Sequence, residues 1–116
     1  MGGNELTDAG VAVLAAALPT SNVRNLSLAA NNMEDAGAFS IAAALSEGFA
    51  PHTLDLADNL IGDDGAAEIV RLAAAQGTPL TLLELSLNPI STEARDAMLE
   101  AAREIASLQR LGVELG

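Results

Sequence analysis

Pairs of aliphatic residues separated by a single residue recur along the chain. The pairs are Leu26 and Leu28, Leu54 and Leu56, Leu83 and Leu85, and Leu111 and Val113. Alternation of this kind is the spacing of a β-strand with one buried face. After each of the first three pairs the period changes, and apolar or small residues recur every four positions, which predicts a helix. The sequence therefore predicts repeated units of strand, turn and helix.

An asparagine marks the turn of each predicted unit. These asparagines are Asn4, Asn31, Asn59 and Asn88, which stand 27, 28 and 29 residues apart. A repeat of this length is typical of a solenoid, in which every unit follows the same path and the strands run parallel. We expect the later three, Asn31, Asn59 and Asn88, to be structural, with buried amides that pair with backbone groups in the turn.

The helices are predicted to pack closely against the sheet. Positions six, ten and fourteen after each asparagine lie on one helical face, and the sixth is always Gly or Ala. These positions hold Gly10, Leu14 and Leu18; Gly37, Ile41 and Leu45; Gly65, Ile69 and Ala73; and Ala94, Met98 and Ala102. We expect the helix start to pass too close to the sheet for a larger side chain at the sixth position. Acidic residues near the helix starts, such as Asp8, Asp35, Asp63, Asp64 and Glu93, are expected to interact favourably with the helix dipole.

Together these patterns predict one α/β solenoid domain over residues 1–116. A short parallel sheet would line the concave side and helices the convex side. The predicted units are a partial repeat 4–22, the repeats 23–50, 51–79 and 80–107, and a terminal partial repeat 108–116.

The motif LxLxxNxϕxxxG resembles the ribonuclease-inhibitor-like class of leucine-rich repeat. It is written at residues 26–37 as LSLAANNMEDAG and at residues 54–65 as LDLADNLIGDDG. The resemblance implies the same solenoid and a role in recognising proteins, without a cofactor. The class also includes Ran GTPase-activating proteins and tropomodulins, so a GTPase-activating regulatory fragment is the alternative function that it implies.

Charge and composition narrow the choice of partner. The net charge of −11, with five Arg and no Lys, makes a negative surface that repels nucleic acid and acidic membrane surfaces. Only 2% of residues are aromatic, so the core must be built from many aliphatic side chains. The absence of cysteine removes disulfides and thiol chemistry and fits a reducing compartment, so we expect a cytoplasmic protein. The partner is expected to be a basic protein or peptide.

Residues beside the buried leucines are predicted to point out of the concave face in rows. The first row is Asn25, Thr53, Leu82 and Arg110, and the second is Ser27, Asp55, Glu84 and Gly112. Asp55, Asp58, Glu84 and Glu114 would form an acidic strip, and Leu82 and Leu87 are apolar where the fold does not require it. The candidate partner-binding residues are Thr53, Asp55, Asp58, Leu82, Glu84, Leu87, Arg110 and Glu114. The alternative is an ordinary solvated surface with irregular repeats.

The hypotheses of a catalytic site or a metal site have weaker support in the sequence. His52 is the single histidine, and a triad with Ser27 and Asp55 would also need an oriented base and an oxyanion site. The acidic run of residues 58–65 lacks the ligand spacing and closing glutamate of an EF-hand. We therefore expect neither a catalytic residue nor a metal site.

The two ends of the predicted stack differ. The first helix, about Asp8 to Leu18, has no strand of its own unit, and Val11 and Val13 add apolar surface beyond its Leu14 face. The N-terminal end is therefore predicted to be open, either for self-association or because the chain is the C-terminal piece of a longer array. The last helix, about Thr92 to Ser107, carries mixed charges typical of a cap, and a last strand is expected at about Arg110 to Glu114.

Overall fold

The computed structural model describes residues 7–105, 108 and 110–112. These residues form helices and strands in strict alternation after the first helix. The helices are α1 (Asp8–Ala17), α2 (Asp35–Ser46), α3 (Asp63–Ala75) and α4 (Thr92–Ala101), and short 3-10 turns extend α1 as η1 (Leu18–Thr20) and α4 as η2 (Ala102–Glu104). The strands are β1 (Asn25–Ser27), β2 (Thr53–Asp55), β3 (Leu82–Glu84) and β4 (Arg110–Gly112).

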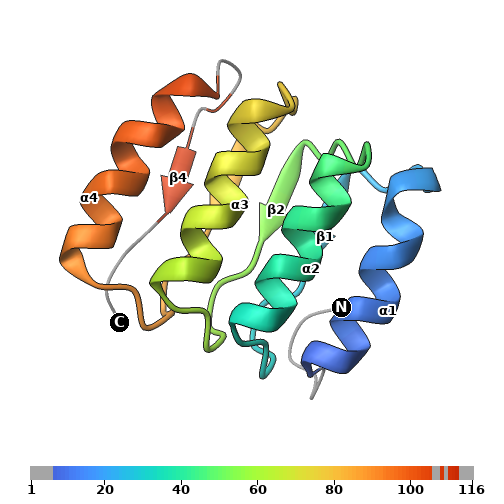
Figure 1. Cartoon of the computed structure of the whole chain (residues 1–116), viewed down its shortest axis with the longest axis horizontal. Helices are drawn as coiled ribbons and strands as arrows, with labels where there is room; N and C mark the ends of the chain where they lie inside the picture. The colour runs from blue at the N-terminus through green and yellow to red at the C-terminus, as the bar shows by residue number, and fades with distance from the viewer. Residues whose placement is uncertain (1–6, 106–107, 109, 113–116) are drawn as a thin grey trace.

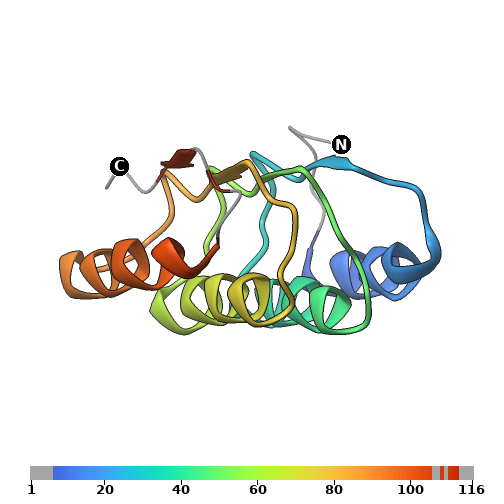
Figure 2. The same cartoon turned by 90° about the horizontal axis from the view of Figure 1, so that it is seen from above.

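The four strands make a parallel sheet in the order of the sequence, β1-β2-β3-β4. The parallel direction predicted from the repeat is confirmed. The helices stand side by side in the same order as the strands (Figure 1). Seen from above, the strands form one layer and the helices the other (Figure 2). Each unit therefore adds one strand to the sheet and one helix to the layer behind it.

The aliphatic pairs of the first three strands form the centre of the core, as predicted. Leu28, Leu54, Leu56, Leu83 and Leu85 have no exposed surface, and Leu26 is buried at the edge of the sheet. The aliphatic residue two positions after each asparagine, Met33, Ile61 and Ile90, joins them. The fourth pair, Leu111 and Val113, lies outside the side chains that the structure describes.

The predicted helical faces are confirmed in α2 and α3 and partly wrong in α1. Ile41 and Leu45 of α2 and Ile69 of α3 have no exposed surface. In α1, however, Val11 is fully buried and Leu14 only half-buried, so Val11 does not add exposed apolar surface as predicted. The reason is that α1 has one neighbouring helix among the described residues, α2. Val11 stands at the position of Ala38, which in α2 packs toward the next helix.

A ladder of asparagine hydrogen bonds joins successive turns. The Asn59 side-chain amide donates to the Leu28 carbonyl of the preceding unit at 2.9 Å, and to the carbonyls of Leu56 and Ala57 in its own unit. Its Oδ1 accepts from the Met33 backbone N–H at 3.1 Å. Asn88 repeats this arrangement one unit later with the Leu56 carbonyl and the Ile61 N–H. Asn59 and Asn88 thus each satisfy backbone groups of two units at once.

A second ladder, made by aspartates, joins the helix starts. Asp8 Oδ1 accepts from the backbone N–H groups of Glu34 at 2.8 Å and Gly37 at 3.0 Å. Asp35 Oδ1 accepts from the Gly62 N–H at 2.6 Å, and Asp63 accepts from both the N–H and the hydroxyl of Ser91. The sequence predicted a favourable position at the helix dipole, but these three carboxylates also bind the first turn of the next unit.

The small residue at the sixth position is explained by the aspartates of this second ladder and, at Gly37, by the Met33 side chain as well. The nearest atoms include none from the strands, so the predicted cause was wrong. A Cβ on Gly65 would lie 2.6 Å from Asp35 Oδ1 and 2.9 Å from the Ala38 Cβ of α2. A Cβ on Gly37 would collide with Asp8 Oδ1 at 2.7 Å and with the Met33 side chain. Gly37 and Gly65 therefore leave room where one helix start passes over the helix start of the preceding unit.

Candidate partner-binding surface

The strand register aligns the predicted rows. Thr53 lies between Asn25 and Leu82 in the first row, and Asp55 between Ser27 and Glu84 in the second. The β3–β4 pairing places the backbone of Arg110 beside Leu82. Glu114 lies outside the described residues, as does the side chain of Arg110, so the acidic strip rests here on Asp55, Asp58 and Glu84.

The polar side chains of the strands are partly held by local hydrogen bonds. Thr53 Oγ1 donates to Asn25 Oδ1 at 2.7 Å, and Asp55 Oδ1 accepts from the Ala57 N–H at 3.1 Å. Glu84 Oε1 accepts from the Ser86 hydroxyl at 2.5 Å. All three side chains are half-buried. Each carboxylate has two oxygens with several acceptor positions, so Asp55 and Glu84 are fixed in place while still able to accept from a partner.

The turns beyond the strands bring a further apolar group together. Leu60 and Leu87 are each 53% exposed and, with Pro89 and Asp58, line a hollow of about 450 Å³ at the edge of the sheet; we refer to these four residues as the turn-edge patch. Sequence reasoning named Asp58 and Leu87 but missed Leu60 and Pro89. The sequence did contain a signal for these two residues. Each directly follows a turn asparagine and is apolar, whereas the earlier unit has the polar Asn32 at the same position.

The backbone at this edge is unusual. Ala30, Asp58 and Leu87 occupy the same position in successive turns and have left-handed φ values of 59°, 57° and 60°. Aspartate tolerates this conformation, whereas leucine is disfavoured there by roughly 1–2 kcal/mol. Leu87 is therefore both strained and exposed to water.

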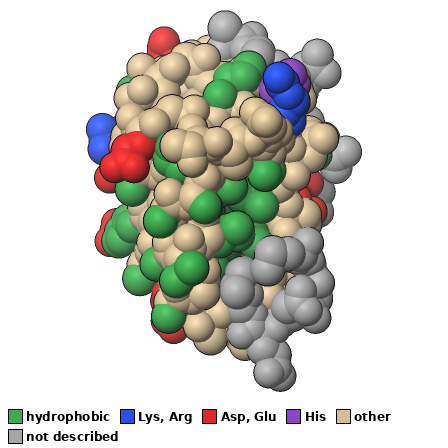
Figure 3. Space-filling model, turned by 90° about the vertical axis from the view of Figure 1, so that its right-hand side faces the viewer, with side chains coloured by type: hydrophobic (Ala, Val, Ile, Leu, Met, Phe, Trp, Pro, Cys, Tyr) green, Lys and Arg blue, Asp and Glu red, His purple; other side chains and the backbone are tan. Residues whose placement is uncertain are grey.

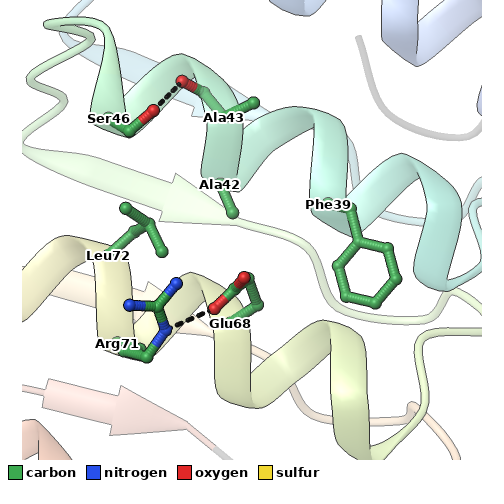
Figure 4. A pocket seen from close by; sticks show the side chains of 7 residues that line it. All are labelled: Phe39, Ala42, Ala43, Ser46, Glu68, Arg71 and Leu72. Atoms are coloured by element: carbon green, nitrogen blue, oxygen red, sulfur yellow. Dashed lines mark hydrogen bonds and ion pairs between the residues drawn. The ribbon is translucent and has the colours of Figure 1, made fainter.

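A shallow groove of about 290 Å³ lies between α2 and α3 on the helix side (Figure 4). Phe39 and Leu72 lie along it, together with Arg71 and Glu68, which form an ion pair at 2.5 Å. The hydrogen bond from Arg71 lowers the pKa of Glu68, and the Glu68 acceptor raises that of Arg71. Sequence reasoning did not predict this groove. Phe39 lies off the buried helical face, and no repeated pattern distinguishes it.

Comparisons with known proteins agree with this architecture. A family model described as "Leucine Rich repeat" matches residues 21–42 and 52–70. Among solved structures, the chain is similar to "Leiomodin-1 Actin-Binding Site 2 (ABS2)", with a TM-score of 0.81 and 23% sequence identity. The chain has a leucine-rich repeat fold. The match covers 92% of this chain and 63% of the leiomodin-1 structure, so the chain spans less than two thirds of that length. A comparison of the sequence with curated proteins gives no significant match.

Within this leucine-rich repeat fold, the arrangement gives no support to a Ser27–His52–Asp55 triad. The His52 ring lies 3.4 Å from the Arg24 guanidinium, and the described hydrogen bonds join it to neither Ser27 nor Asp55. Among the residues that the structure describes, no three His, Cys, Asp or Glu side chains gather in a way that could hold a metal ion. In the same part of the chain, no helix is long and apolar enough to cross a membrane.

Proposed function

We propose that the chain is a non-catalytic protein-binding module that binds a basic partner on the strand face and its turn edge. The observation that carries this proposal is Leu87. The turn has the same left-handed φ at Ala30, Asp58 and Leu87, and of these three only Leu87 carries a large apolar side chain, which is 53% exposed. A large apolar side chain exposed at the edge of a sheet is the kind of residue that a partner buries at the centre of an interface.

The chemistry around Leu87 fits a partner with both apolar and basic groups. The turn-edge patch offers apolar surface that a partner could bury, and Asp58 belongs to it. On the strands nearby, Asp55 and Glu84 stand side by side. Apolar contacts at the centre of an interface supply most of the affinity, and complementary charge steers association. Leu82 and Thr53 would extend the contact across the first row, and Arg110 and Glu114 would continue it at the far strand.

The size of this surface limits the partner. Four strands about 4.8 Å apart give a face roughly 15 Å across, which suits a peptide, a helix or the edge of a domain. We take this face to be the concave side of a solenoid of the ribonuclease-inhibitor-like class. The likeness to an actin-binding site supports the same kind of function, the binding of a protein. A GTPase-activating role and a cytoplasmic location stay predictions without a specific structural observation.

The test compares matched leucine variants. Leu87→Asp places at this turn the residue that Asp58 already supplies, so the variant should keep its circular dichroism spectrum and melt no lower than the parent. Leu99→Asp, on an exposed leucine of α4, is the control. Binding to immobilised peptides that combine Lys or Arg with Leu is measured at low and high salt. We expect the affinity to fall at least about tenfold for Leu87→Asp, and for Asp55→Arg combined with Glu84→Arg, with no change for Leu99→Asp. Equal binding by all variants would exclude this face.

A further inference from the structure

Helix α1 has no polar outer face. Its exposed residues are Ala9, Ala12, Val13, Ala16 and Ala17, and its single charged residue, Asp8, is held in the aspartate ladder. Val13 is 77% exposed. The end view shows hydrophobic side chains gathered over this end of the stack (Figure 3). A helix that is apolar all round is normally covered on every side.

The outward side of α1 matches the side that α2 presents to α1. In α2, positions six, ten and thirteen residues after the turn asparagine hold Gly37, Ile41 and Ala44, and all three are buried. Gly37 donates to Asp8, and Ala44 lines a hollow shared with α1. In α1 the same positions hold Gly10, Leu14 and Ala17, which are half-buried or exposed. The outward side of α1 therefore has small and aliphatic residues at the positions that are buried in α2.

The helix start of α1 matches in the same way. Glu34 and Gly37, at the start of α2, donate their backbone N–H groups to Asp8 of the preceding unit. Thr7 and Gly10 stand at the equivalent positions in α1, and Thr7 makes no side-chain cap. An aspartate from a further unit would meet these two N–H groups as Asp8 meets those of α2.

We propose that the α1 end is a stacking surface for another leucine-rich repeat unit whose helix begins with an aspartate. The unit would present a small apolar side like that of α2, where Asp35 and Ala38 pack on Gly65. Its strand would pair with β1, which among the described residues pairs with β2 alone. This contact continues the helix–helix interface that already joins α1 to α2, α2 to α3 and α3 to α4. It does not depend on the function of the strand face.

A second copy of the chain fits this surface less well. At its α4 end, Thr92 stands where the earlier helices have Asp8, Asp35 and Asp63, and Arg95 stands where they have Val11, Ala38 and Ala66. At its α1 end, the carboxylate of Asp8 is already bound to its own α2. Neither end can supply the missing combination of a free aspartate and a small apolar helix side.

The experiment extends the chain with its own repeat. A copy of residues 23–58 is joined directly to Asn4, so that the copied Asp35 precedes Asp8 by one unit. We expect a single thermal transition, raised by about 5 °C or more, and reduced binding of an apolar dye. In the extended chain, Ala17→Glu in α1 should remove most of the rise in melting temperature, and so should Asp35→Ala in the added copy. Ala97→Glu, on an exposed alanine of α4, is the matched control and should leave the rise in melting temperature unchanged.

Two results would overturn the proposal. One is an added unit that melts separately or leaves the melting temperature and dye binding unchanged. The other is found by sedimentation of the original chain. A dimer that forms with rising concentration and is abolished by Ala17→Glu would show that a second copy occupies this end.

Discussion

At the scale of single residues, the turn asparagines are the most constrained polar groups. Asn59 is 4% exposed, and its amide makes three donor contacts and one acceptor contact across two units. Removing it leaves backbone groups of two turns without a partner, and such groups destabilise a fold strongly.

We expect Asn59→Ala to lower the free energy of unfolding by about 2–4 kcal/mol. Chemical denaturation followed by circular dichroism measures the change. Asn32→Ala, on an exposed asparagine in the neighbouring turn, is the control and should stay within about 0.5 kcal/mol. A small effect for Asn59→Ala would mean that water replaces the ladder.

Asp63 links stability to pH through the second ladder. The backbone N–H and hydroxyl of Ser91 lower the pKa of Asp63 because both donate to its charged form. A lowered pKa in the folded state means that the stabilisation is present above the ordinary pKa and is lost as the pH falls through the folded value.

The parent chain should therefore lose stability on acidification below about pH 4 in part through Asp63. Asp63→Asn should reduce the difference in melting temperature between neutral and acid pH. Asp64→Asn, on the exposed neighbour, should leave that difference unchanged. Identical acid profiles for the parent chain and Asp63→Asn would refute the link.

At the scale of elements, helix α1 shows what a sequence pattern can and cannot place. Its start at Asp8 was predicted correctly, and its end at Ala17, followed by η1, differs by one residue from the prediction. Its buried side was misplaced, because the motif describes a helix between two neighbours and α1 packs on one described neighbour. The last helix, α4, ends at Ala101 and continues as η2 to Glu104, short of the predicted Ser107.

The burial of α1 gives a prediction within one helix. Val11→Ala should destabilise by about 1.5–3 kcal/mol, because Val11 is fully buried and its methyl groups leave a cavity. Val13→Ala should change stability by less than about 0.5 kcal/mol, since Val13 faces solvent. Denaturant titrations of both variants measure the difference. The opposite order would contradict the burial of Val11 and the exposure of Val13.

At the scale of the whole molecule, the surface is dominated by one sign of charge. Sixteen acidic residues face five arginines, and two ion pairs, Arg71 with Glu68 and Arg103 with Glu100, are present among the described residues. Both pairs are largely exposed and add little to stability. Repulsion between carboxylates should therefore outweigh attraction across the folded chain.

We expect added salt to stabilise this protein. Raising sodium chloride from about 0.05 M to about 0.5 M should raise the melting temperature, because screening weakens the repulsion. The same change should weaken binding to a basic peptide. A melting temperature that falls with salt would show that attractive pairs outweigh the excess of negative charge.

The candidate surface was predicted in part. The register that places Thr53 beside Leu82 and Asp55 beside Glu84 follows from the repeat alone, because equivalent positions must align in a parallel stack. The strain at Leu87 and the nearness of Leu60 and Pro89 could not be read in this way. They depend on backbone angles and on distances between successive turns, which the spacing of residues along the chain does not give.

By itself, the sequence determined the fold class, the parallel order of the strands and most of the core. Period and spacing are local, and a repeat imposes the same local solution in every unit. Only the tertiary structure decided that Asp8, Asp35 and Asp63 bind the next unit, and that Gly37 and Gly65 make room for these contacts. These facts concern atoms from different units, and their distances follow from how closely the helices stack.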